Sequence, residues 1–319
     1  MKKPVLLAAK IAVSLALLAY LLSTTDLAAL SGRVRRGDPL LLGAAAALYA
    51  AILALSTWRW RLLLEAQGYD APLGRLSASY LVATFFNNFL PSNIGGDIVR
   101  VRDSSQITGS TTASVAVVAV DRILGFGALY FLAVVAFITG GPALRGLAGA
   151  RALIAGLGVL FGILAYMFFR PGTARGIMGA SGLARIPWVR EKFEVVQAAV
   201  HVYREELPAV FIAFGASVAL QAVVVGYFYT VAKALRIPLS LPACFLMVPL
   251  NILIQTVPIS FNGWGVRESV FIVYFRQVGL PKDSALAFSL VGAGLIVLLS
   301  LSGAVVWTSR GAGPEPSPT

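Results

Sequence analysis

Long runs of apolar residues decide what this chain can fold into. A helix needs roughly 20 apolar residues to cross about 30 Å of hydrocarbon. Six stretches of the chain have about that length with few charges inside them. They are Val5–Leu22, Leu40–Leu63, Ala113–Ile138, Leu147–Phe169, Leu207–Ala232 and Ser284–Trp307. The sequence therefore predicts an all-α polytopic membrane protein with about six full spans.

The composition leaves little room for a soluble domain. Of the 319 residues, 58% are hydrophobic and 13% are charged, about half the charged share of a soluble domain. We expect a single integral membrane domain over residues 1–310 and a disordered Gly/Pro/Ser-rich tail over 311–319. Met1 to Lys3 precede an apolar run that is long for a signal peptide and lacks a clear cleavage site, so we interpret it as an uncleaved span.

The net charge of +12 does not point to nucleic acid. The basic residues lie mostly in loops and at span ends, where they set topology and attract anionic headgroups. The single cysteine, Cys244, lies in an apolar stretch and is expected to be a small buried hydrophobe. The single histidine, His201, lies in a polar loop and is expected to be solvated. We predict no cofactor and no metal site.

Lysine and arginine in the loops indicate the orientation. The longest polar connection, about 170–206, carries six of these residues and is placed in the cytoplasm, as is the N-terminus with Lys2 and Lys3. We expect a multi-pass protein of a bacterial or archaeal cell (inner) membrane. Arg33, Arg35 and Arg36 fall on the outer side in this scheme and argue against it.

Two further apolar stretches, Leu76–Leu90 and Leu241–Val257, are short and run into segments rich in Pro, Gly and Asn. In this topology the first must start and finish on the cytoplasmic side, which makes it a re-entrant hairpin. Hairpin one denotes residues 76–103 here, and hairpin two denotes residues 241–268.

The two hairpins share a motif. Pro91 to Arg100 and Pro258 to Arg267 both fit Pro-x4-Gly-x2-Val-Arg, 167 positions apart. The same offset relates the spans on either side, giving repeat halves of about 39–139 and 206–307. An odd number of crossings separates the copies, so the sequence predicts an inverted repeat, an architecture in which transporters bind substrate at the repeat interface. Chance similarity between two Gly/Pro loops is the alternative.

The hairpins supply the candidate site. Proline and glycine break a helix and let backbones approach closely. The helix that follows Gly96 points its N-terminal N–H groups at the break, which favours anions. Arg100 and its repeat partner Arg267 are candidate phosphate ligands, because the guanidinium fork fits phosphate oxygens in pairs. The hairpin backbone residues are Pro91, Gly95, Gly96, Pro258, Gly263 and Gly265.

Other polar residues at the hairpins have two interpretations each. Asp97 is either a helix-cap carboxylate or a substrate ligand. Glu268 either pairs with Arg267 for structural reasons or orients it. Trp264 either stacks on substrate or anchors at the interface, which we favour. The remaining candidates are amides that would hydrogen-bond a polar headgroup: Asn88, Asn93 and Asn262.

Asp121 and Arg122 lie inside a predicted span. Ionisable residues in a membrane are costly and usually face the interior and find partners. We expect one of the two to reach Arg100 or Asp97, with either a structural or a functional role. No Walker loop, Rossmann fingerprint, zincin motif or nucleophile elbow is present, which argues against an enzyme.

These residues carry a family resemblance. Phe85 to Arg100, then Asp121 and Arg122, then Pro258 to Glu268 resemble the signatures of the lysylphosphatidylglycerol synthase transmembrane-region family, also described as flippase-like domains. The resemblance covers nearly the whole chain. In the full synthase this region precedes a soluble aminoacyltransferase domain and is thought to flip the aminoacylated lipid. The chain ends at Thr319 without such a domain, so we do not expect lysyl transfer.

Our hypothesis is a flippase-like translocase of an anionic lipid. A phospholipid or polyprenyl-phosphate-linked sugar would enter between the repeats, with Arg100, Arg122 and Arg267 on its phosphate. Two alternatives stay open. One is a non-transporting subunit that presents lipid to a separate glycosyltransferase or aminoacyltransferase. The other is a membrane-embedded transferase that uses Asp97, Asp121 or Glu268 as a base.

Overall fold

A computed structural model describes residues 2–90, 95–147, 149–170, 206–257 and 260–310, together with a few isolated positions between 176 and 203. The described part is all-helical, without strands. The helices are α1 (Lys2–Ser23), α2 (Leu27–Arg35), α3 (Pro39–Glu65), α4 (Leu73–Phe89), α5 (Gly95–Thr108), α6 (Thr111–Thr139), α7 (Gly141–Arg145), α8 (Ala150–Phe169), α11 (Leu207–Ala234), α12 (Leu241–Gln255), the 3₁₀ turn η2 (Phe261–Gly263), α13 (Val266–Gln277) and α14 (Lys282–Ser309).

Four of the described helices, α3, α6, α11 and α14, are long and apolar enough to cross a membrane. They coincide with four of the six predicted spans. The other two predicted spans are helices as well, α1 and α8, but they do not belong to that set. The second half of α1 and α2 form a pair bent by 93° at Thr24–Asp26, which would raise the number of spans to five. The first 22 residues are thus a helix that ends in a sharp bend.

Both predicted hairpins are pairs of helices joined by a break. α4 ends at Phe89 and α5 begins at Gly95, while α12 ends at Gln255 and α13 begins at Val266. Pro91, Asn93 and Pro258 lie outside the described residues. Pro249 lies inside α12 without ending it, because the helix continues to Gln255. Each break between helices therefore falls in a segment rich in Pro, Gly and Asn.

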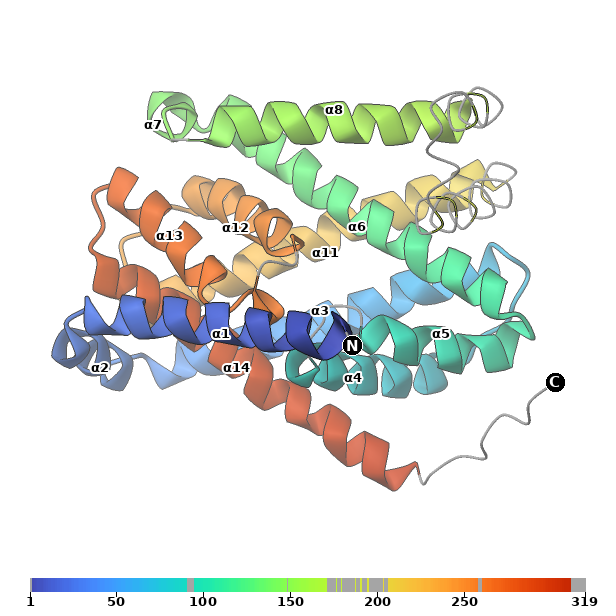
Figure 1. Cartoon of the computed structure of the whole chain (residues 1–319), viewed down its shortest axis with the longest axis horizontal. Helices are drawn as coiled ribbons and strands as arrows, with labels where there is room; N and C mark the ends of the chain where they lie inside the picture. The colour runs from blue at the N-terminus through green and yellow to red at the C-terminus, as the bar shows by residue number, and fades with distance from the viewer. Residues whose placement is uncertain are drawn as a thin grey trace.

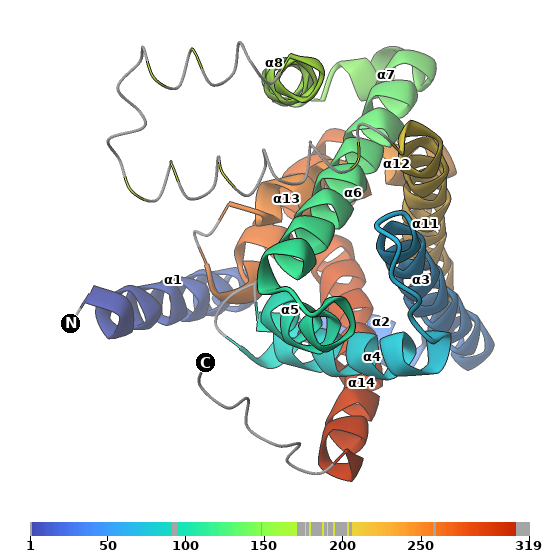
Figure 2. The same ribbon diagram turned by 90° about the vertical axis from the view of Figure 1, so that its right-hand side faces the viewer.

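The two halves of the chain pack against each other in a reciprocal way. α3 lies along α11 (Figure 2), α4 lies against α14, and α12 lies against α6. Within each half, α5 contacts α6 and α13 contacts α14. α1, α4, α5 and α8 run roughly along one direction, and α6 and α14 are tilted across them (Figure 1). This arrangement brings the two breaks close to each other, because Asn262 Nδ2 donates to the Asn88 carbonyl.

Two helices lie outside this core. α8 packs against α6 and lies at the edge of the molecule (Figure 1). α1 contacts hairpin two: the backbone N–H of Phe261 donates to Ser14 Oγ over 2.7 Å. Gly265 has a φ of +84°, which disfavours a side chain, and a Cβ there would lie 2.5 Å from Leu17 Cβ. The backbone conformation and the close packing therefore both require glycine at this position.

The interior is filled by aromatic and aliphatic side chains. Phe228, Phe271, Phe275 and Phe288 form a cluster of tilted and edge-to-face rings from α11, α13 and α14. Cys244 is buried in the same core, as expected from its sequence context.

The predicted cytoplasmic connection is tied to the bundle at one described position. Tyr203 is fully buried and donates its O–H to the Leu63 carbonyl at the end of α3 over 2.8 Å. Burial raises the pKa of the Tyr203 phenol, so it remains a donor at ordinary pH. His201 and most of residues 171–205 lie outside the described residues, as do residues 311–319.

Candidate functional site

Asp121 is the centre of a buried group of charges beside hairpin one. Its carboxylate accepts from Arg59 Nε of α3 over 2.7 Å and from Arg100 Nη1 of α5 over 2.9 Å. Arg59 also donates to Ser217 Oγ of α11 over 2.9 Å. The Asp121 side chain is 2% exposed and that of Arg100 is 5% exposed. One carboxylate therefore links three helices in the interior, where an unpaired charge would be costly.

A second carboxylate extends this group toward the surface. Asp97, in the first turn of α5, accepts from Arg122 Nε of α6 over 2.8 Å and lies 3.8 Å from Arg100 Nη1. The Arg122 side chain is 35% exposed, so it is the accessible member. Arg59, Asp121, Arg100, Asp97 and Arg122 are named the charge ladder here. Three guanidiniums against two carboxylates leave one positive charge.

Arg100 has more donors than the ladder uses. In the described part of the chain, its Nε and Nη2 are buried without a hydrogen-bond partner. Its guanidinium lies over the ring of Trp60 at 4.6 Å and near that of Tyr80 at 5.2 Å. Stacking on rings stabilises the cation, but it does not supply an acceptor. An acceptor such as an anion's oxygen would complete the site.

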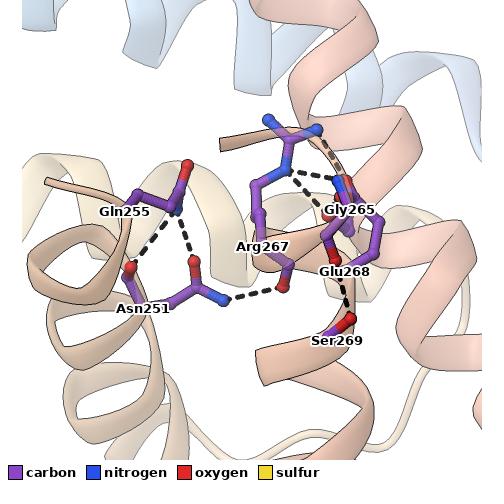
Figure 3. A network of polar contacts seen from close by, with 7 residues as sticks. Asn251, Gln255, Gly265, Arg267, Glu268 and Ser269 are labelled. Atoms are coloured by element: carbon purple, nitrogen blue, oxygen red, sulfur yellow. Dashed lines mark hydrogen bonds and ion pairs between the residues drawn. The ribbon is translucent and has the colours of Figure 1, made fainter. Parts of the chain in front are cut away.

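Hairpin two carries its own charge pair (Figure 3). Arg267 donates to Glu268 Oε1 from Nε over 2.9 Å and from Nη2 over 2.7 Å. Ser289 of α14 donates to the same oxygen over 2.9 Å. Glu268 Oε2 accepts from the Gly265 backbone N–H over 2.6 Å, which caps the N-terminus of α13. Glu268 is fully buried, and both of its carboxylate oxygens accept from donors of the protein.

Trp264 lies against this pair. Its ring is 4.5 Å from the Arg267 guanidinium. We favoured an anchor at the membrane interface from the sequence. In the structure Trp264 is the stacking partner of Arg267, and its position at a membrane interface stays a prediction.

Carboxamides line the place where the hairpins meet. Asn262 Nδ2 donates to the Asn88 backbone carbonyl over 3.5 Å, which joins residues 174 positions apart. Asn262 itself adopts a left-handed conformation with φ of +48°. On hairpin two, Gln255 hydrogen-bonds Asn251, and Asn251 donates to the Arg267 carbonyl over 3.0 Å (Figure 3). Both breaks therefore meet in a polar zone made of amides.

The helices that precede the two breaks end with matching contacts. Asn88 Nδ2 donates to the Thr84 carbonyl, and Gln255 Nε2, 167 positions later, donates to the Asn251 carbonyl. A Cβ on Gly96 would lie 2.6 Å from the Asn87 amide nitrogen, and one on Gly263 would lie 2.6 Å from the Gln255 amide oxygen. At each break a glycine lets the chain press against an amide of the preceding helix.

A family model described as the lysylphosphatidylglycerol synthase TM region matches residues 7–303. The chain belongs to this family. A search among curated proteins gives no match. Membership confirms the resemblance and, with the apolar helices, identifies a multi-pass membrane protein with a lipid-related role.

The structure places most of the candidate residues of this family member in two groups. Asp97, Arg100, Asp121 and Arg122 lie together in the charge ladder, so both members of the Asp121–Arg122 pair reach hairpin one. Arg267 and Glu268 form the second group, and Asn88 and Asn262 join the hairpins. Gly95, Gly96, Gly263 and Gly265 are at the breaks. Asn93, Pro91 and Pro258 lie outside the described residues.

Several residues of the site were not anticipated from the sequence. They are Arg59, Trp60, Tyr80, Ser217, Asn251, Gln255 and Ser289. Arg59 follows Trp58 at the end of an apolar run, where an arginine indicates the boundary of a span rather than a buried ion pair. The repeat offset could have found Gln255 and Ser289, which correspond to Asn88 and Arg122. Among the described residues, no three His, Cys, Asp or Glu side chains gather as a metal site requires.

Proposed function

We propose that this protein is a flippase-like translocase of an anionic lipid or lipid-linked headgroup. The observation that carries the proposal is the contact of two broken helices at Asn88 and Asn262. One helix pair carries the buried Arg100 and the other carries Arg267, whose side chain is 12% exposed. Broken helices inside a membrane are tolerated where they line a wet cavity or bind a substrate. Arginine in a low-dielectric surrounding suits a phosphate oxygen.

The packing of the helices supports an inverted repeat as part of the proposal. The reciprocal packing of α4 on α14 and α12 on α6 is the pattern that a two-fold relation between the halves would produce. The matching amide contacts 167 positions apart extend the relation to side chains. In this scheme the hairpins enter from opposite faces of a bacterial or archaeal cell membrane, the N-terminus is cytoplasmic, and each hairpin opens to its own side in turn.

Within this scheme the arginines have different tasks. Arg122, the accessible end of the charge ladder, receives the lipid phosphate first. Arg100 and Arg267 provide the positive potential that favours an anion between the hairpins. Arg100 also offers that anion two N–H groups, those of Nε and Nη2, that have no other acceptor among the described residues. The asparagines hydrogen-bond the rest of the headgroup.

The test is translocation of fluorescent phosphatidylglycerol in liposomes that contain the purified protein. We expect Arg122→Gln to slow translocation about tenfold or more, because a hydrogen bond to a charged group contributes roughly 1.5–3 kcal/mol. The fold should persist, since Asp97 keeps Arg100 at 3.8 Å. Arg61→Gln is the matched control: Arg61 is 33% exposed in an ion pair with Glu65 at the end of α3. Its translocation rate should equal that of the wild type.

Two results would contradict the proposal. Equal rates for Arg122→Gln and wild type would remove Arg122 from the site. Lipid bound by the wild-type protein without translocation of any lipid would favour the subunit that presents lipid to a separate transferase.

A further inference from the structure

The site also indicates the charge of the headgroup. Resting on the proposed function, we infer that the substrate carries its phosphate on an uncharged, hydroxyl-bearing headgroup, and that a cationic aminoacylated headgroup is excluded. The family is named for a lysylated lipid, so this chain would handle a different substrate class.

A cationic headgroup would need a carboxylate, and the carboxylates of the site are committed. Asp121 lies between Arg59 and Arg100 and is 2% exposed. Glu268 is fully buried among Arg267, Ser289 and the Gly265 N–H. Asp97 bonds Arg122 and lies near Arg100. An ammonium could take one of these acids only by leaving a guanidinium unpaired inside the membrane, which is costly.

The balance of charge also opposes a cation. The charge ladder has one positive charge in excess, and the Arg267–Glu268 pair is neutral. A phosphodiester brings one negative charge and neutralises this excess. A lysyl ester adds two ammonium groups to the phosphate, so it would bring a net positive charge to a site that is already positive. Like charges brought together in such a site cost several kcal/mol.

Aromatic rings are the other common receptors of ammonium groups, and three rings of this site each have an arginine on one face. Trp60 and Tyr80 lie against Arg100, and Trp264 lies against Arg267. Each ring already holds a guanidinium at 4.5 to 5.2 Å. On these faces a lysyl ammonium would have to displace a guanidinium from its ring.

The groups that remain at the meeting point are carboxamides. Asn88, Asn262, Gln255 and Asn251 lie around the contact between the hairpins. A carboxamide offers both donors and acceptors, and so does a hydroxyl, so the two pair in either direction. This chemistry fits a glycerol, inositol or sugar headgroup. The shared feature is a phosphodiester next to a polyol, in a phospholipid or a polyprenyl phosphate sugar.

The experiment compares matched lipids on the full-length protein. Binding in detergent and translocation in liposomes are measured for phosphatidylglycerol, its lysyl ester with the same acyl chains, and a polyprenyl phosphate sugar. We expect the lysyl ester to bind at least about tenfold more weakly than phosphatidylglycerol, because it brings like charge to the site. The comparison of the polyprenyl phosphate sugar with phosphatidylglycerol shows which of the two lipids supplies the hydroxyl-bearing headgroup.

A variant that gains binding of the lysyl ester is a useful second test, because a folding defect would weaken binding rather than strengthen it. Asn262→Asp adds a carboxylate where the hairpins meet and should raise binding of the lysyl ester while weakening that of phosphatidylglycerol. Equal or tighter binding of the lysyl ester by the wild-type protein would overturn the inference. Selective binding without translocation would support the inference and contradict the proposed function, so the two fail separately.

Discussion

Asp121→Asn should be the most damaging single substitution in the charge ladder. The change removes the counter-charge of Arg59 and Arg100, which lie 2.7 and 2.9 Å from the carboxylate in the interior. Breaking a buried ion pair by removing one partner costs about 3–5 kcal/mol. Since a protein's whole stability is roughly 5–15 kcal/mol, we expect a large fall in melting temperature and in folded yield, measured by size-exclusion chromatography of heated detergent samples.

Asp103→Asn is the matched control. Asp103 also pairs with an arginine, Arg310, at 3.0 Å, but both side chains are 23–29% exposed. A solvated pair contributes about 0–1 kcal/mol, so this variant should melt close to the wild type. Asp121→Glu keeps the charge and should recover part of the loss. If Asp121→Asn melted like Asp103→Asn, the interior position of the ladder would be wrong.

The spans were predictable because a membrane imposes a length. Four of the six predicted apolar runs, 40–63, 113–138, 207–232 and 284–307, needed no tertiary information, and their helices end within a few residues of these limits. The breaks were predictable for a similar reason, because proline and glycine act on the local backbone. The short helix α2 was missed: its nine residues are too few and too polar to stand out as a span.

The partners of the charges were only partly predictable. Arg267 and Glu268 are adjacent in sequence, and their pairing was one of two interpretations. The ion pair of Asp121 and Arg59 joins residues 62 positions apart in the sequence. The hydrogen bond from Arg59 to Ser217 joins residues 158 positions apart. These contacts depend on how α3, α6 and α11 cross, which no local pattern specifies.

Gly303 is the second position where we expect a large effect. It lies where α14 crosses α4, and a Cβ there would be 2.1 Å from the Leu81 carbonyl oxygen and 2.7 Å from its carbon. Both atoms belong to the backbone of a helix, so no side chain can rotate away. Gly303→Ala must separate α14 from α4. Overpacking of this kind costs typically 1–3 kcal/mol and occasionally more.

The same helix supplies the control. Gly294 also lies in α14, and a Cβ there would meet no atom within 4 Å. Gly294→Ala should leave the melting temperature unchanged or raise it slightly, because alanine favours a helix over glycine by about 1 kcal/mol. Equal melting temperatures for Gly303→Ala and Gly294→Ala would contradict the close approach of α14 and α4. Because α4 leads into hairpin one, Gly303→Ala should also slow lipid translocation, which connects the packing of α14 with the position of Asn88.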